Sequence, residues 1–171
     1  MTDNQAKKDI MYSILFLCTA NRFRSPIAEA TFHKLLKKQN IENDWTVESA
    51  GTWTQPGFPI IPSEEWIRDN LGLEISGHRS KIVDLKMISQ FDLIVVMESN
   101  QKEALSVEYP CESHKIYMLT ELTDGPIYDI SDPVRQKSEE FLCIGKEIIN
   151  LIEKNFNKIL QRVYSNHGMK I

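Results

Sequence analysis

A cysteine and an arginine six residues apart could together handle a phosphate group near the start of this chain. Cys18 opens the run CTANRFRS, and Arg24 is the seventh residue of that run. A cysteine thiolate is a strong nucleophile, and the planar guanidinium of arginine can hold two phosphate oxygens at once. This spacing is weak evidence by itself, so the interpretation depends on the residues around it.

The residues around this run have the pattern of a strand that leads into a helix. Ile14–Leu17 is a continuous apolar run, and Pro26–Lys38 carries apolar residues on one helical side, with Pro26 in its first turn. Backbone N–H groups at such a junction, together with the helix dipole, favour a bound anion and a thiolate. Asn21 tolerates the left-handed backbone of a tight loop, and Ser25 can donate to the thiolate. The sequence therefore predicts a phosphate-binding loop here.

Phosphoryl transfer through a cysteine also needs a proton donor for the leaving oxygen. The loop Thr123–Pro133 contains three aspartates. Asp132 is the candidate, because Pro133 would stiffen the backbone that follows it. The sequence pattern separates Asp132 poorly from Asp129.

The rest of the chain alternates short apolar runs with longer amphipathic stretches. Three further strands are expected, over Thr46–Ala50, Leu93–Met97 and Lys115–Leu119. Four further helices are expected, over Ser63–Leu71, Ile82–Ser89, Asn100–Ser106 and Ser138–Phe156. This alternation predicts βαβ units and a mostly parallel sheet. Ligands of such sheets bind beyond the carboxyl ends of the strands, which is where the run from Cys18 would lie.

Length and composition indicate a single globular domain that spans residues 1–171, with tails expected over residues 1–11 and 165–171. The net charge of −4 argues against nucleic acid as a partner. The polar start and the short apolar runs predict neither a signal peptide nor a membrane span. Three cysteines without a CxxC pair fit a reduced, cytoplasmic protein better than a disulfide scaffold.

The chain resembles the low-molecular-weight protein tyrosine phosphatase family from about Ser13 to Phe156. The resemblance rests on five motifs in matching order, namely CTANRFRSP at 18–26, SAGT at 49–52, SGHRS at 76–80, FDLIVVME at 91–98 and DP at 132–133. It implies an α/β three-layer sandwich with a four-stranded parallel sheet flanked by helices, the Rossmann-like phosphotyrosine phosphatase I fold. It further implies a phosphorylated protein as substrate, a monomer, and no metal or cofactor.

The resemblance also implies a role for each matching residue. Cys18 would be the nucleophile, Arg24 the phosphate and transition-state binder, and Asp132 the general acid and then base. The remaining phosphate-binding positions would be Thr19, Ala20, Asn21, Arg22 and Phe23. The hydrogen-bond network that holds the loop would comprise Asn21, Ser25, Ser49 and His78. From their places in loops, Trp53 and Tyr128 are candidates for the pocket wall.

Several positions depart from the family pattern. The family usually has glycine at Ala20, often a second cysteine at Phe23, and an apolar residue or threonine at Arg22. Aromatic residues often follow the Asp-Pro pair, whereas this chain has Val134 and Arg135. The sequence therefore indicates phosphatase chemistry more firmly than a preference for phosphotyrosine.

Three other functions would use part of the same pattern. An arsenate reductase of the same fold needs two relay cysteines after Phe91, and the chain has none before Cys111. A non-catalytic phosphate or phosphopeptide binder would not need the combination of nucleophile, arginine and acid. A phosphoarginine phosphatase favours a small threonine at the position of Arg22, and arginine there would repel a guanidinium.

Overall fold

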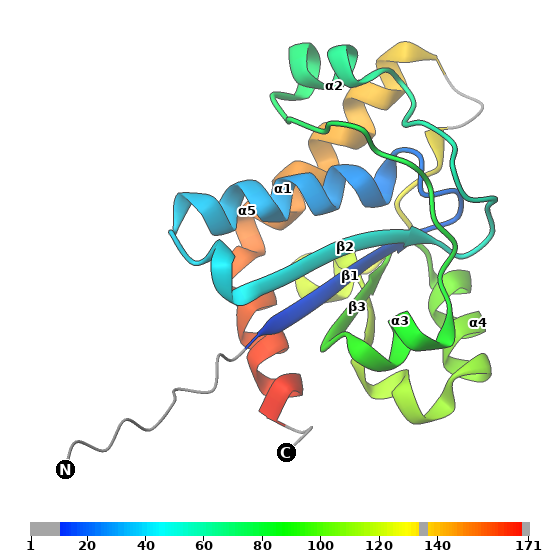
Figure 1. The fold of residues 1–171 in the computed structure, drawn as a ribbon, viewed down its shortest axis with the longest axis vertical. Helices are drawn as coiled ribbons and strands as arrows, with labels where there is room; N and C mark the ends of the chain where they lie inside the picture. The colour runs from blue at the N-terminus through cyan, green and yellow to red at the C-terminus, as the bar shows by residue number, and fades with distance from the viewer. Residues whose placement is uncertain (1–10, 134–136, 169–171) are drawn as a thin grey trace.

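Four parallel strands form the centre of the molecule (Figure 1). The computed structural model describes residues 11–133 and 137–168. The strands are β1 (Tyr12–Cys18), β2 (Trp45–Gly51), β3 (Leu93–Val96) and β4 (Ile116–Met118), in the order β2-β1-β3-β4. Most of the expected tails lie outside the described residues, as do Val134 and Arg135.

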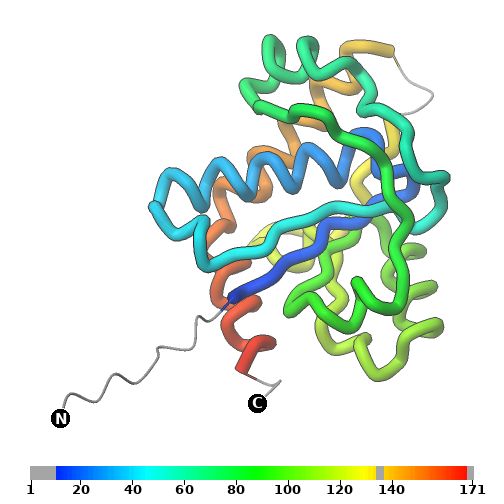
Figure 2. The backbone as a smooth tube through the Cα atoms, viewed as in Figure 1, coloured from blue at the N-terminus to red at the C-terminus, as the bar shows by residue number. Residues whose placement is uncertain are grey.

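Helices cover both faces of this sheet, as Figures 1 and 2 show. One face carries α1 (Arg24–Lys38) and α5 (Ser138–Gly168), with α2 (Glu64–Leu71) beside them. The other face carries α3 (Leu85–Gln90) and α4 (Ser99–Glu108). Three short 3₁₀ helices complete the described elements, η1 (Glu42–Asp44), η2 (Pro110–Lys115) and η3 (Leu119–Leu122). The predicted three-layer α/β architecture is confirmed.

The core is divided between the two faces of the sheet. Along β1, Ile14 and Phe16 face α1 and α5, while Leu15 and Leu17 face α3 and α4. All four side chains are fully buried. A strand buried on both faces reads as a continuous apolar run, which explains why β1 was recognisable in the sequence.

The expected end of the last helix, Phe156, lies next to a kink at Asn155, where φ is −114° and ψ is 15°. Helical structure resumes after this kink and continues to Gly168, through the part from Ser165 onward that was expected to fray. Ile159 and Val163 are fully buried and extend the apolar side of the helix past the predicted end. Packing against the sheet, rather than helix propensity, therefore keeps the last turns helical.

The helix expected over Ile82–Ser89 begins later than predicted, at Leu85. Ile82 instead forms an isolated parallel bridge with Gly51, which keeps the chain extended there. The side chain of Asp84 accepts the N–H of Met87 and caps the helix start. None of the described helices is long and apolar enough to cross a membrane.

Candidate active site

The predicted phosphate loop begins where β1 ends, at the carboxyl edge of the sheet. Cys18, 2% exposed, is the last residue of β1 and pairs with Gly51 of β2. The N–H of Thr52 donates to the Cys18 carbonyl, and the N–H of Trp53 donates to the Thr19 carbonyl. A Cβ atom on Gly51 would lie 2.7 Å from the carbonyl oxygen of Thr19. Glycine therefore allows β2 to approach the loop this closely.

Backbone N–H groups of the loop are free to bind an anion. Those of Thr19, Ala20, Arg22 and Phe23 have no acceptor among the residues that the structure describes. Helix α1 follows at Arg24, and no side chain caps its N-terminus. A run of unpaired N–H groups at a helix N-terminus favours a phosphate group.

Two polar groups contact the thiol of Cys18. The Sγ atom lies 3.0 Å from Ser25 Oγ and 3.3 Å from the backbone nitrogen of Asn21. Asn21 has the predicted left-handed backbone, with φ of 53°, whereas Ala20 does not have a positive φ. The loop therefore accommodates the Cβ of Ala20 without strain.

Three of the predicted supporting residues, Ser25, Ser49 and His78, contact the fourth, Asn21. Its Nδ2 donates to Ser25 Oγ at 3.0 Å and to Ser49 Oγ at 2.9 Å, and its Oδ1 accepts the N–H of Lys81 at 3.0 Å. His78 Nε2 lies 2.7 Å from the carbonyl oxygen of Asn21. Because a carbonyl oxygen only accepts, this ring nitrogen carries the proton.

Arg24 is almost fully buried and is held from several sides. Its Nη1 donates to the carbonyl of Ile130 at 2.7 Å and pairs with the carboxylate of Glu98. Its Nη2 lies 3.0 Å from Asp132 Oδ2 and 3.3 Å from Thr19 Oγ1. These contacts aim the guanidinium at the loop and bring the predicted acid to the same place.

The aspartates of the loop Thr123–Pro133, which the sequence pattern hardly distinguishes, have different contacts in the structure. Asp132 lies beside Arg24, with its side chain 37% exposed. Both carboxylate oxygens of Asp129 instead accept hydrogen bonds from Ser99, from its N–H at 2.7 Å and its Oγ at 3.1 Å. Asp124 pairs with a lysine of α5. Of these three aspartates, Asp132 is the one that contacts a residue of the predicted phosphate loop in the part of the chain that the structure describes.

Three further residues hold the site and were not predicted. Glu98 pairs with Arg24, Gln101 Nε2 donates to Thr19 Oγ1 at 3.1 Å, and Glu29 accepts the Ser49 hydroxyl at 2.6 Å. Glu98 closes the motif FDLIVVME, so its acidic side chain at the end of a strand was an available signal. Gln101 and Glu29 lie on helices, and no sequence signal of this kind distinguishes them from other polar helix residues.

The side chains of Phe23 and Arg22 pack against residues outside the predicted phosphate loop. Phe23 is buried and packs edge-on against Phe141 of α5 at 5.0 Å, so only its backbone can reach a phosphate. Arg22 donates from Nε to the carbonyl of Pro59 at 3.0 Å, and its guanidinium lies 5.1 Å from the ring centre of Phe58. Phe23 therefore stays a predicted phosphate-binding position through its backbone N–H alone.

The two aromatic candidates for the pocket wall are exposed. Trp53 is 82% exposed and follows the residues that pair with the loop. Tyr128 is 39% exposed, and its hydroxyl donates to Glu147 at 2.7 Å. This hydrogen bond to a carboxylate raises the pKa of Tyr128 to about 12. In the described residues, no group of three His, Cys, Asp or Glu side chains could hold a metal ion.

Comparison with known proteins points to one family. The family model described as low molecular weight phosphotyrosine protein phosphatase matches residues 13–168. The chain is 28% identical over 151 residues to the probable low molecular weight protein-tyrosine-phosphatase EpsP of Ralstonia nicotianae, covering 88% of this chain and 95% of that one. It is also 28% identical to a protein-arginine-phosphatase of Geobacillus stearothermophilus, covering 86% and 96%. The crystal structure of a low molecular weight protein tyrosine phosphatase from T. tengcongensis superimposes with a TM-score of 0.78 at 32% identity, covering 86% and 99%.

Proposed function

The chain belongs to the low molecular weight phosphotyrosine protein phosphatase family, and we propose that it removes phosphate from protein tyrosine residues through a phosphocysteine on Cys18. It is a cysteine-dependent phosphatase. One observation carries the mechanistic proposal. Cys18 begins a loop of unpaired N–H groups, and Arg24 of the same loop has its Nη2 atom 3.0 Å from Oδ2 of Asp132.

In the first step, the Cys18 thiolate attacks the phosphorus atom and forms an S–P bond. The bond between phosphorus and the leaving oxygen breaks, and the carboxylic acid of Asp132 gives that oxygen its proton. The loop N–H groups and Arg24 bind the other phosphate oxygens and stabilise their charge in the transition state. Because Arg24 contacts Asp132, a phosphate bound to the guanidinium places its leaving oxygen near the acid.

In the second step, Asp132 acts in its carboxylate form. It takes a proton from a water molecule as that water attacks phosphorus, and the S–P bond breaks. The electron pair returns to sulfur, where the hydroxyl of Ser25 and the N–H of Asn21 stabilise the thiolate. Inorganic phosphate leaves, and the enzyme regains its starting protonation state.

We favour phosphotyrosine over phosphoarginine as the substrate, although one relative is named a protein-arginine-phosphatase. Arg22 stands at the loop and its positive charge disfavours a second guanidinium. The exposed rings of Trp53 and Tyr128 flank the loops that carry Cys18 and Asp132, and we propose them as part of the wall that contacts the substrate ring.

We also infer a cytoplasmic monomer. All three cysteines are free, and Cys111 and Cys143 are exposed, which suits a reducing compartment. Sedimentation equilibrium of the purified protein tests the monomer, and cell fractionation tests the compartment.

Hydrolysis of p-nitrophenyl phosphate by the wild type, Cys18→Ser and Cys143→Ser tests the function. We expect the Cys18 variant to be inactive and the Cys143 variant to match the wild type, because Cys143 is exposed on α5. Equal activity of the wild type and the Cys18 variant would overturn the proposal. Rates on peptides that carry phosphotyrosine, phosphoserine or phosphoarginine then test the substrate, and we expect phosphotyrosine to be fastest.

A further inference from the structure

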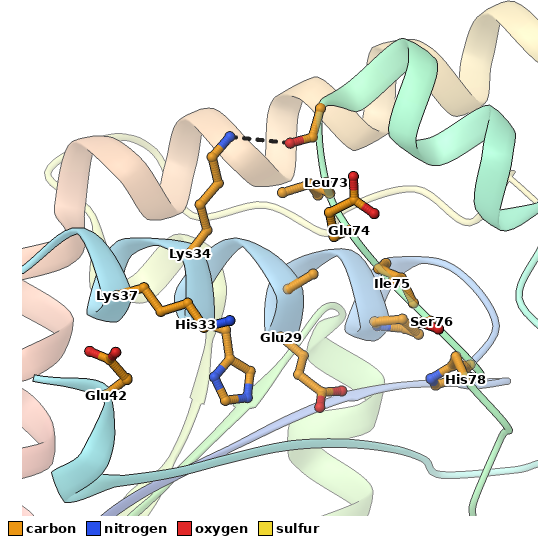
Figure 3. A pocket seen from close by; sticks show the side chains of 13 residues that line it. Glu29, His33, Lys34, Lys37, Glu42, Leu73, Glu74, Ile75, Ser76 and His78 are labelled. Atoms are coloured by element: carbon orange, nitrogen blue, oxygen red, sulfur yellow. Dashed lines mark hydrogen bonds between the residues drawn. The ribbon is translucent and has the colours of Figure 1, made fainter. Parts of the chain in front are cut away.

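A cavity of about 710 Å³ lies between α1 and residues 72–78, and it shares two residues with the support of the phosphate loop. Figure 3 shows Glu29 and His33 projecting from α1 on one side, with Glu74 and His78 on the other. His78 contacts the carbonyl of Asn21, and Glu29 accepts the hydroxyl proton of Ser49. The outer end of the network is therefore open to this cavity.

The direction of each hydrogen bond in the network follows from its donors and acceptors. Asn21 Oδ1 accepts the N–H of Lys81, so its Nδ2 must face the two serines and donate to both. The oxygen of Ser49 therefore accepts from Asn21, and the proton of Ser49 must go elsewhere. It goes to Glu29 Oε2, 2.6 Å away. Ser25, on the other side, keeps its proton for Cys18 or for a backbone carbonyl.

Glu29 is the only acceptor for the Ser49 hydroxyl among the residues that the structure describes. Ser49 is fully buried, so without Glu29 its proton would be unpaired, or the hydroxyl would rotate away from Asn21. Asn21 holds the strained left-handed turn of the loop and donates its N–H to Cys18. A change at Glu29 therefore reaches the nucleophile through two side chains.

We propose that Glu29 is a positioning residue for the phosphate loop, and that it acts from the cavity through Ser49 and Asn21. The inference rests on the proposed phosphatase function, since it concerns the same loop. Because Glu29 lines an open cavity, a small carboxylate from solution can replace a missing side chain there. That property separates the role of Glu29 from a general effect on stability.

The first test is kcat and KM for p-nitrophenyl phosphate in three variants. Glu29→Ala lowers kcat about five- to tenfold with little change in KM, which is the factor that corresponds to one lost hydrogen bond. Glu29→Gln stays within about twofold of wild type, because its amide oxygen can accept the same proton. Glu74→Ala, the matched control on the same cavity, leaves both constants unchanged, because Glu74 is exposed and forms no hydrogen bond with a described residue.

The second test is chemical rescue with sodium formate against sodium chloride at equal ionic strength. Formate restores the kcat of Glu29→Ala. It does not restore the kcat of Ser49→Ala or of the double variant Glu29→Ala/Ser49→Ala, because both lack the serine hydroxyl that would donate to formate. The double variant is no slower than Ser49→Ala alone, because both changes interrupt one chain of hydrogen bonds.

Wild-type kcat in Glu29→Ala would overturn the inference, as would multiplicative losses in the double variant or a loss that formate does not reverse. If Glu29→Ala does not fold, Glu29→Leu, which keeps about the volume of the side chain, replaces it in the comparison of kcat with wild type and in the double variant with Ser49→Ala. If the wild type itself does not hydrolyse phosphate esters, the proposed function fails. The inference is then tested by the rate at which iodoacetamide alkylates Cys18, measured by peptide mass spectrometry, which Glu29→Ala lowers and Glu74→Ala does not.

Discussion

Replacing each of two neighbouring aspartates by asparagine tests which one exchanges protons with the substrate. Asp132 lies 3.0 Å from Arg24, at the loop that begins with Cys18. Asparagine keeps the size of the side chain and cannot donate a carboxylic proton. General acid catalysis contributes about 10²–10⁴-fold, or about 2.7–5.4 kcal/mol of barrier, and we expect Asp132→Asn to lose this amount in kcat.

The matched change, Asp129→Asn, removes much less. Both oxygens of Asp129 accept hydrogen bonds from Ser99 at the first turn of α4. An asparagine side chain at this position would keep one acceptor oxygen, so the change weakens one hydrogen bond to an exposed side chain, and we expect kcat to fall by no more than about tenfold. The two variants should therefore differ by at least about tenfold.

The assay compares kcat for p-nitrophenyl phosphate and phenyl phosphate in both variants. Phenolate is the poorer leaving group, so it depends more on a proton from the enzyme. The deficit of Asp132→Asn should be larger on phenyl phosphate, and that of Asp129→Asn should be equal on both substrates. A larger loss of kcat in Asp129→Asn than in Asp132→Asn would refute the assignment of the acid. A loss of kcat in Asp132→Asn that is equal on both substrates would refute it as well.

Three further changes have defined outcomes. Gly51→Ala places a Cβ atom 2.7 Å from a carbonyl oxygen of the loop, so we expect at least about a tenfold fall in kcat, whereas Gly125→Ala, with 3.6 Å to its nearest neighbour, should be neutral. Glu98→Gln leaves the buried Arg24 with one charge partner fewer, and thermal unfolding should show a loss of about 1–2 kcal/mol. The hydrogen bond from Tyr128 raises the pKa of its hydroxyl to about 12, so it stabilises the folded state fully below about pH 10, and this contribution is lost as the pH rises toward 12. The difference in the free energy of unfolding between wild type and Tyr128→Phe should therefore shrink over that range.

The sequence was informative where local pattern decides structure. The run Ile14–Leu17 predicted β1, because a strand buried on both faces has no polar positions. The helix expected over Ser63–Leu71 is α2, whose start is capped by Ser63 Oγ, which accepts the N–H of Trp66, and whose end is followed by Gly72 with φ of 65°. The loop that follows Cys18 was predictable in its position, because it is one continuous segment between a strand and a helix.

Contacts between distant segments could not be predicted in the same way. Arg24 and Glu98 are 74 residues apart, and Thr19 and Gln101 are 82 apart, so only the assembled sheet brings them together. Phe23 shows a second limit, because an aromatic residue in a catalytic loop can point into the core as readily as into a pocket. The last turns of α5 depended on burial against the sheet, which helix propensity does not report.

The most direct test of the account is to find the phosphoryl group on the enzyme during turnover. The wild type is mixed with p-nitrophenyl phosphate, quenched in acid within the first turnovers, and digested for mass spectrometry. The account predicts one added phosphoryl group on the peptide that contains Cys18, and a larger fraction of it in Asp132→Asn, whose second step is slowed. A phosphoryl group on another residue, or full hydrolysis without any at Cys18, would contradict it.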